Sequence, residues 1–93
     1  MIKTFRHRGL ERFFTTGDGR GLQPGQLVRV RRLLGILDAA ETVETLQLFP
    51  DMRLHAPKGA RTGVWAISNS RMWQINFSIE DRDVCDVNLV RYY

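Results

Sequence analysis

The segment Met72–Glu80 alternates between apolar and polar side chains more regularly than any other part of the chain. Successive side chains of a strand point to opposite faces of its sheet, so the alternation predicts a strand with two different faces. The inward side chains are expected to be Trp73, Ile75, Phe77 and Ile79, and the outward ones Gln74, Asn76 and Ser78. A sheet built around this strand has one face packed on a core and one polar face.

The rest of the chain predicts helices before this strand and short strands around it. Helices are expected at Leu10–Phe14, from Pro24 through Leu37, and within Asp38–Leu46. Strands are expected at Ile2–Phe5, Met52–Ala56, Val64–Ser68 and around Cys85, Val87 and Leu89. Residues 1–93 thus form one α+β domain, in which an N-terminal strand and two to three helices pack on one face of a small sheet. The sheet is expected to be mostly antiparallel and to have about four to five strands, because the last connections are short.

Arginine dominates the charge of the chain. The net charge is +4, with twelve arginines against two lysines. Guanidinium groups suit phosphate, so a nucleic acid is one expected partner, and a basic surface that only confers solubility is the other interpretation. The same two interpretations apply to Arg29 and Arg32, which face away from the apolar stripe of the second helix and contact either solvent or an RNA or acidic partner.

Cysteine content and hydropathy bear on the cellular compartment. Cys85 is the single cysteine, which leaves no disulfide within the chain and fits a reducing cytosol. Its place in an apolar pattern predicts a packing role rather than a catalytic one. No apolar run of about 18 residues is present, and the N-terminus lacks the apolar core of a signal peptide. We therefore expect a cytoplasmic protein without a membrane span.

The segment Leu54–Arg61 brings together an imidazole, an ammonium and a guanidinium, at His55, Lys58 and Arg61. RNA cleavage needs such groups, because a base removes the proton of a ribose 2′-OH, a cation stabilises the phosphate and an acid protonates the departing 5′ oxygen. A basic surface loop is the alternative interpretation. His7 is expected at the surface, and no metal site is predicted because no cluster of cysteines and histidines is present.

Four aromatic residues have contrasting expected roles. Trp65 and Trp73 occupy inward strand positions, which favours packing in the core. Tyr92 and Tyr93 follow Arg91 at the C-terminus, where they are placed to stack on bases or to donate a proton. The alternative for the two tyrosines is a frayed terminus.

Met1–Leu10 and the helix end Leu37–Ala40 precede a basic and aromatic run that contains Leu54, His55, Lys58, Gly59, Arg61, Gly63, Trp65, Ile67, Trp73, Ile75 and Phe77. In this order and at these distances, the segments resemble the HigB-type toxins, the plasmid-maintenance killer family of the RelE superfamily. The resemblance extends from residue 1 to residue 93. It implies a RelE-like fold.

The resemblance also implies an activity and partners. Toxins of this kind are ribosome-dependent mRNA endoribonucleases that need no metal or other cofactor. The 2′-OH attacks the adjacent phosphate and leaves a cyclic phosphate and a free 5′-OH. The expected partners are the ribosome, mRNA and a HigA-like helix-turn-helix antitoxin, with operator DNA bound only through the antitoxin complex.

Site residues carry over from the family position by position. His55, Lys58 and Tyr92 match the catalytic histidine, lysine and tyrosine of HigB toxins, and Arg61 matches a basic residue of the same loop. Gln74 stands where the family commonly has the arginine that holds the transition-state phosphate.

Other departures lie near the C-terminus. Where the family ends in Asp-Tyr-His, this chain has Arg91, Tyr92 and Tyr93. Arg91 and Arg71 are therefore the candidates to contact the phosphate in place of the missing arginine, and Tyr93 joins the candidate acids and bases.

These departures leave more than one function open. The first is an active endoribonuclease with the residues named above. The second is a weak or inactive toxin homologue that mainly binds the antitoxin and adjusts repression. A gyrase poison like the related ParE toxins is disfavoured, because the loop with His55 and Lys58 is a feature of the RNases.

Overall fold

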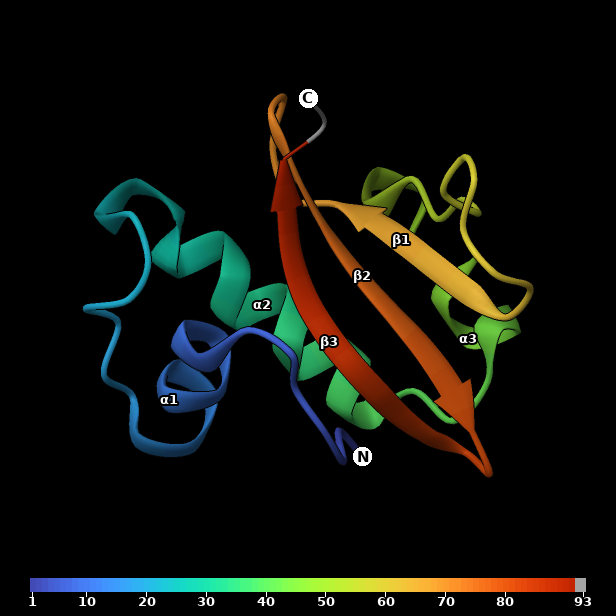
Figure 1. The fold of residues 1–93 in the computed structure, drawn as a ribbon, viewed down its shortest axis with the longest axis horizontal. Helices are drawn as coiled ribbons and strands as arrows, with labels where there is room; N and C mark the ends of the chain where they lie inside the picture. The colour runs from blue at the N-terminus through green and yellow to red at the C-terminus, as the bar shows by residue number, and fades with distance from the viewer. Residues whose placement is uncertain (92–93) are drawn as a thin grey trace.

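In the computed structural model, which describes residues 1–91, the first half of the chain is helical and the second half forms a sheet (Figure 1). The elements are α1 (Arg8–Thr16), η1 (Pro24–Gln26), α2 (Leu27–Ala39), α3 (Val43–Leu46), η2 (Pro50–Met52), β1 (Val64–Ser68), β2 (Trp73–Glu80) and β3 (Asp83–Arg91). This order confirms the α+β class predicted from the sequence. None of the helices within residues 1–91 is long and apolar enough to cross a membrane.

β2 is the centre of an antiparallel three-stranded sheet with the order β1-β2-β3. The strand predicted from the alternation of Met72–Glu80 therefore occupies the middle of the sheet. β2 and β3 are joined by the two-residue turn Asp81 and Arg82, whose φ angles of 51° and 69° are both positive. Two-residue hairpins need this left-handed conformation to match the twist of their strands.

Two further segments lie along the edges of the sheet without forming strands. Ile2 and Phe5 each form an isolated parallel bridge to β3, and His55 forms an antiparallel bridge to β1. The structure thus has three strands instead of the four to five expected, because these edge segments pair only at single positions. Both edges of the sheet are nevertheless partly covered by hydrogen-bonded backbone.

The predicted strand Met52–Ala56 is wrong in this respect. Met52 ends the 3-10 helix η2, which begins with Pro50, and Arg53 follows with a left-handed φ of 51°. A proline donates no backbone hydrogen bond, and a left-handed residue breaks the extended path, so the segment cannot continue as a strand. Met52 is still fully buried.

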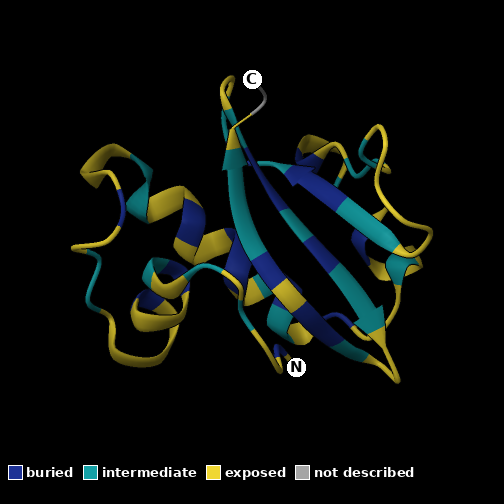
Figure 2. Ribbon diagram, viewed as in Figure 1, coloured by how far each residue is buried: buried dark blue, intermediate teal, exposed yellow. Residues whose placement is uncertain are grey.

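The helices and the strands share one core on a single side of the sheet. β2 contributes Ile75 and Phe77, which are separated by the less buried Asn76. Buried positions recur along the middle of β2 and β3 (Figure 2). The core consists of Ile2, Leu10, Phe13, Leu22, Val30, Leu33, Leu34, Leu37, Ala40, Leu46, Met52, Ile67, Ile75, Phe77, Val84 and Val87. Since the helices cover this side, the polar side chains of β2 are left on the other face.

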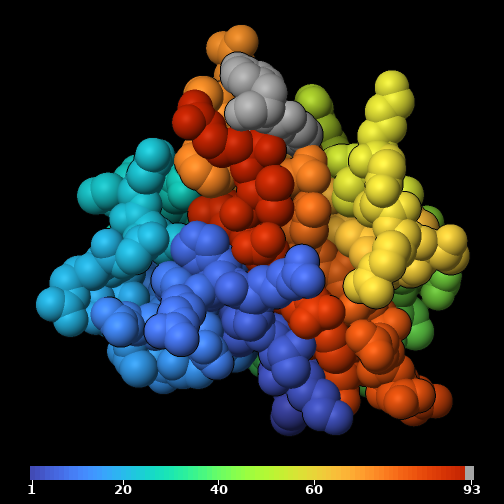
Figure 3. Space-filling model, viewed as in Figure 1, coloured from blue at the N-terminus to red at the C-terminus, as the bar shows by residue number. Residues whose placement is uncertain are grey.

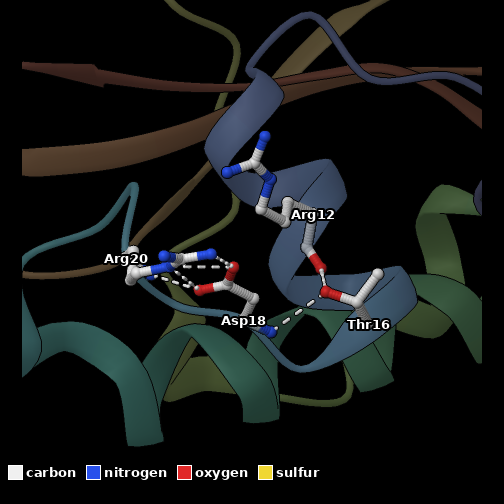
Figure 4. A network of polar contacts seen from close by, with 4 residues as sticks. All are labelled: Arg12, Thr16, Asp18 and Arg20. Carbon is white, nitrogen blue, oxygen red and sulfur yellow. Dashed lines mark hydrogen bonds and ion pairs between the residues drawn. The ribbon is translucent and has the colours of Figure 1, made fainter.

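The loop between α1 and α2 is held by local polar contacts. Arg20 donates to both carboxylate oxygens of Asp18, at 2.8 to 3.1 Å, and this hydrogen bonding lowers the pKa of Asp18 to about 2 (Figure 4). The backbone N–H of Asp18 donates in turn to the Thr16 hydroxyl, at 3.2 Å. Gly9 and Gly21 let the loop approach α1 closely, because a Cβ on Gly9 would lie 2.9 Å from the Gly21 carbonyl oxygen.

His7 caps the N-terminus of α1. Its Nδ1 accepts a hydrogen bond from the backbone N–H of Leu10 at 3.1 Å. Only an unprotonated nitrogen accepts, so the cap needs the neutral imidazole. Burial lowers the pKa of His7, which favours the same neutral form.

Because the cap needs the neutral imidazole, we expect the free energy of unfolding to depend on pH through His7. Because the pKa of His7 is lower in the folded state, its contribution is complete above the unfolded value of about 6.5 and is lost as the pH falls through the folded value. His7→Ala should lower the free energy of unfolding by about 1 kcal/mol at pH 7.5 and by less at pH 5. Urea unfolding followed by circular dichroism at both pH values measures this.

His7→Asn is the matched control, because asparagine caps a helix without titrating. This variant should keep wild-type stability at pH 7.5 and lose less stability than the wild type between pH 7.5 and 5. If the wild type and His7→Asn lose equal stability over this range, His7 does not act as a titrating cap.

Candidate active site

The face of the sheet opposite the core presents a row of polar side chains along β2. Gln74, Asn76 and Ser78 alternate there with the core residues Ile75 and Phe77. Gln74 is buried, and its Nε2 donates to Oδ1 of Asn76 at 2.8 Å. In the space-filling view, the orange and red surface of β2 and β3 is not covered by the helices (Figure 3). The row is therefore part of an uncovered surface.

His55 is fixed at the β1 edge of the sheet by its backbone. Its N–H donates to the Ala66 carbonyl at 2.9 Å, and its carbonyl accepts from the Ala66 N–H at 2.7 Å. The left-handed turn at Arg53 directs the chain into this bridge. The position of the imidazole thus depends on a backbone conformation that the sequence pattern did not reveal.

The hydrogen bonding of His55 also selects its tautomer. Nδ1 lies 2.7 Å from the carbonyl oxygen of Arg53. Since a carbonyl oxygen only accepts, Nδ1 carries the proton, and Nε2 of the neutral ring keeps a free lone pair. A histidine held this way is ready to remove a proton through Nε2.

His55 lines a cleft of about 440 Å³ that we call the His55 cleft. Its lining residues are His55, Ala56, Pro57, Lys58, Gln74 and Arg91. These come from the edge segment, the loop before β1, the central strand and the end of β3, and four of them were predicted as site residues from the sequence. Among the described residues that line the cleft there is no carboxylate, so Lys58 and Arg91 give it a positive charge. A cleft of this charge favours an anion such as phosphate.

Trp73 contacts Arg91, one of the residues that line the cleft. The two residues face each other across the β2–β3 pair, and the guanidinium carbon of Arg91 lies 5.5 Å from the centre of a Trp73 ring. This distance fits a cation–π contact. Trp65 packs against the core as predicted, but Trp73 is absent from the described core cluster, so its predicted packing role is wrong. The sequence pattern could not show that Trp73 lies opposite Arg91 across β2 and β3.

Two other predicted site residues do not line the His55 cleft, and two more lie outside the described part of the chain. Arg61 lines a second depression on the same face, the Asp86 hollow, which is lined by Arg6, Arg61, Val64, Asn76, Phe77, Ser78, Asp86 and Asn88. Arg71 is exposed in the turn between β1 and β2 and lines neither depression. Tyr92 and Tyr93 lie outside the described residues.

The basic face of α2 is occupied by contacts within the chain. Arg29 donates to the backbone carbonyl of Asn69 at 2.5 Å, and Arg32 forms an ion pair with Asp51 at 3.1 Å. These arginines therefore connect α2 to the β1–β2 turn and to η2. Their contacts give the basic face a structural role beside the two interpretations drawn from the sequence.

Cys85 and metal-binding groups offer no other site. Burial raises the pKa of the Cys85 thiol, so the reactive thiolate is disfavoured at neutral pH. Within residues 1–91, no group of three or more histidines, cysteines or carboxylates is placed to hold a metal ion. The chemistry of the described chain is therefore concentrated on the open face of the sheet.

Comparisons with known proteins agree with the fold and with the residues at the cleft. Residues 3–92 match the family model described as RelE-like toxin of type II toxin-antitoxin system HigB. A curated protein of Proteus vulgaris, Endoribonuclease HigB, is 32% identical over 95 aligned residues, which cover the whole of both chains. The chain belongs to the HigB-like family of RelE-like toxins from type II toxin–antitoxin systems.

Proposed function

We propose that this toxin is an endoribonuclease that cleaves mRNA on the ribosome through the His55 cleft. The observation that carries the proposal is the cleft itself, whose lining combines His55, with its fixed tautomer, and the basic residues Lys58 and Arg91. Its relative in Proteus vulgaris carries the name endoribonuclease, which supports the same activity here. RNA cleavage by an internal nucleophile needs these groups and no others beyond an acid.

The reaction begins at the ribose 2′-OH. Nε2 of His55 removes the hydroxyl proton, and the oxygen attacks the adjacent phosphorus in line with the departing 5′ oxygen. Lys58 and Arg91 stabilise the negative charge that builds on the phosphate. The P–O5′ bond breaks as the 5′ oxygen receives a proton, and the products are a 2′,3′-cyclic phosphate and a free 5′-OH.

The acid for the last step comes from the C-terminal tyrosines in this proposal. The ordinary pKa of a tyrosine is about 10, so Tyr92 or Tyr93 is protonated at neutral pH and suited to donate. Both residues lie outside the described part of the chain, and the assignment rests on the family motif. Arg61 is assigned to the flanking RNA, because it lines the Asp86 hollow rather than the cleft.

The partners follow from the family and from the open site. A type II toxin implies an antitoxin, and we propose a HigA-like helix-turn-helix protein that also carries the complex to operator DNA. The sheet face that holds the cleft is uncovered, which suits a substrate presented by the ribosome. We place the protein in the cytoplasm, where ribosomes and messages meet.

A second function, antitoxin binding with little catalysis, is favoured by one observation. Gln74 occupies the cleft where the family has an arginine, and it is neutral and hydrogen-bonded to Asn76. Loss of one preorganised electrostatic contact costs about 100- to 1000-fold in rate. Induction of the chain alone in a bacterial host separates the two functions, because only the nuclease stops growth.

Lys58 provides the sharpest test of the site, since Lys3 is the one other lysine and serves as its matched control. Lys58→Ala should reduce cleavage of ribosome-bound message by about 100- to 1000-fold, because the charge on the transition state loses a cation. Lys3→Ala removes the same charge away from the cleft and should cleave like the wild type. Primer extension on the cleaved message measures both rates.

His55→Ala should show a loss of the same order as Lys58→Ala, and the double variant should release the growth arrest. Circular dichroism checks that each variant keeps its fold. Growth arrest that survives the double change would contradict the assignment of this cleft.

Gln74→Arg should increase the rate, because the cleft would gain the phosphate-binding charge that this chain lacks. The increase should reach up to about 100-fold over wild type, the size of one such contact. Gln74→Met, with similar length and no charge, is the control and should not exceed the wild type. Equal rates for Gln74→Arg and wild type would show that Arg91 already supplies the contact.

A further inference from the structure

The Asp86 hollow is a second polar depression on the open face, and segments far apart in the sequence build it. The N-terminal segment contributes Arg6, the loop before β1 contributes Arg61, and β2 and β3 form the floor. Figure 3 shows the blue N-terminal segment against red β3 and the yellow loop on the other side of the strands. Arg6 and Arg61 thus line the same depression from opposite edges of the sheet.

The charged groups around the hollow are held apart. Arg6, Arg61 and Asp86 all line it, yet none of them takes part in the ion pairs found among residues 1–91. Opposite charges that line one depression without closing on each other leave room for a ligand between them. Such a ligand needs an acidic group for the arginines and hydrogen-bond donors for the carboxylate.

Asp86 is directed into the hollow by a bulge in β3. The register of β2 and β3 shifts between Asn76 and Ser78, and Asp86 has a left-handed φ of 55°. Its backbone N–H donates to the Thr4 hydroxyl at 2.8 Å, which holds the bulge against the N-terminal segment. Bulges re-aim side chains and are common beside active sites.

Backbone strain supports a functional role for this bulge. Among residues 1–91, four residues other than glycine have positive φ, namely Arg53, Asp81, Arg82 and Asp86. The positive φ angles of Asp81 and Arg82 are explained by the hairpin turn between β2 and β3. The remaining two lie beside the two depressions, where Arg53 positions His55 and Asp86 lines the hollow. Strained residues persist where the surrounding structure holds them, and they cluster at binding sites.

The hollow adjoins the His55 cleft along β2. Gln74 lines the cleft, Asn76 lines the hollow, and a 2.8 Å hydrogen bond joins them. Two residues of a strand span about 7 Å, so a ligand of one further nucleotide reaches from one depression to the other. The hollow has a volume of about 90 Å³, much less than the 440 Å³ of the His55 cleft, which suits the edge of a base rather than a whole nucleotide.

We propose that the Asp86 hollow binds the base of a nucleotide next to the scissile phosphate and selects guanine, an inference that rests on the nuclease function proposed above. Guanine is the RNA base whose pairing edge presents two adjacent donors, N1–H and the N2 amino group, to one carboxylate. Adenine and cytosine present a ring acceptor beside their amino group, which the carboxylate repels. Uracil flanks its single N–H with two carbonyl oxygens. The arginines bind the O6 side and the backbone phosphate.

The first test does not require cleavage. GMP, IMP, AMP, CMP and UMP are titrated into the whole protein while the backbone amides of Asn76, Asp86 and Asn88 are followed by NMR. GMP should bind roughly 5- to 150-fold more tightly than AMP, the range for one bidentate base contact. IMP, which lacks the N2 amino group, should fall between them. Equal affinities for GMP and AMP would overturn the proposal, whatever the enzyme does.

Asp86→Asn tests the carboxylate itself. Asparagine tolerates a left-handed φ as well as aspartate does, so the bulge and the fold should persist. The variant should bind GMP and AMP with similar affinity. Asp81→Asn, an exposed hairpin residue outside the hollow, makes the same charge change and should keep the preference of the wild type. A preference for GMP that survives in Asp86→Asn would contradict the role of Asp86.

A second measurement connects the hollow to cleavage. Ribosome-bound messages that differ only in the bases flanking the cut are compared, and the wild type should cleave best with guanine at one flanking position. Asp86→Asn should lose this preference while still cleaving. If no message is cleaved but GMP still binds selectively, the nuclease proposal fails and the base-binding hollow stands.

Discussion

The structure depends on the one-sided burial of its central strand. Ile75 and Phe77 of β2 are fully covered by the core, and their neighbours Gln74 and Asn76 point to the opposite face. Because side chains alternate with a period of two, a slip of one residue would exchange the two faces. The apolar packing that stabilises the domain therefore also determines which side chains form the site. The register of β2 therefore determines both the core and the candidate site.

That register made part of the molecule predictable. The second helix, the central strand and the outward row on β2 follow from local periodicity, which needs no knowledge of distant contacts. The interval 52–56 misled the prediction, because an alternating pattern there competes with Pro50 and a left-handed Arg53. A strand was predicted at Ile2–Phe5, but this segment pairs with β3 only through single bridges at Ile2 and Phe5, which an apolar pattern does not distinguish from a full strand.

The candidate site was predictable by residue type but not by geometry. His55, Lys58, Gln74 and Arg91 were all identified in the sequence, and they line one cleft. What the sequence could not show is how each is held. The tautomer of His55 depends on the Arg53 carbonyl, a contact between backbone and ring that no side-chain pattern encodes. The Asp86 hollow, similarly, requires a bulge and an approach of the two ends of the chain.

The departure at Gln74 has a physical counterpart on the neighbouring strand. Arg91 is paired with Trp73, one position before Gln74. Its guanidinium lies over the indole ring, and Arg91 lines the same cleft as Gln74. A phosphate responds to the distance and direction of a charge, whichever strand carries it. Antiparallel pairing brings residues far apart in sequence within reach of one ligand, so a cation can move between partner strands without a change in the sheet. The neutral Gln74 donates to the side-chain oxygen of Asn76 and so links the cleft to the hollow without adding a charge.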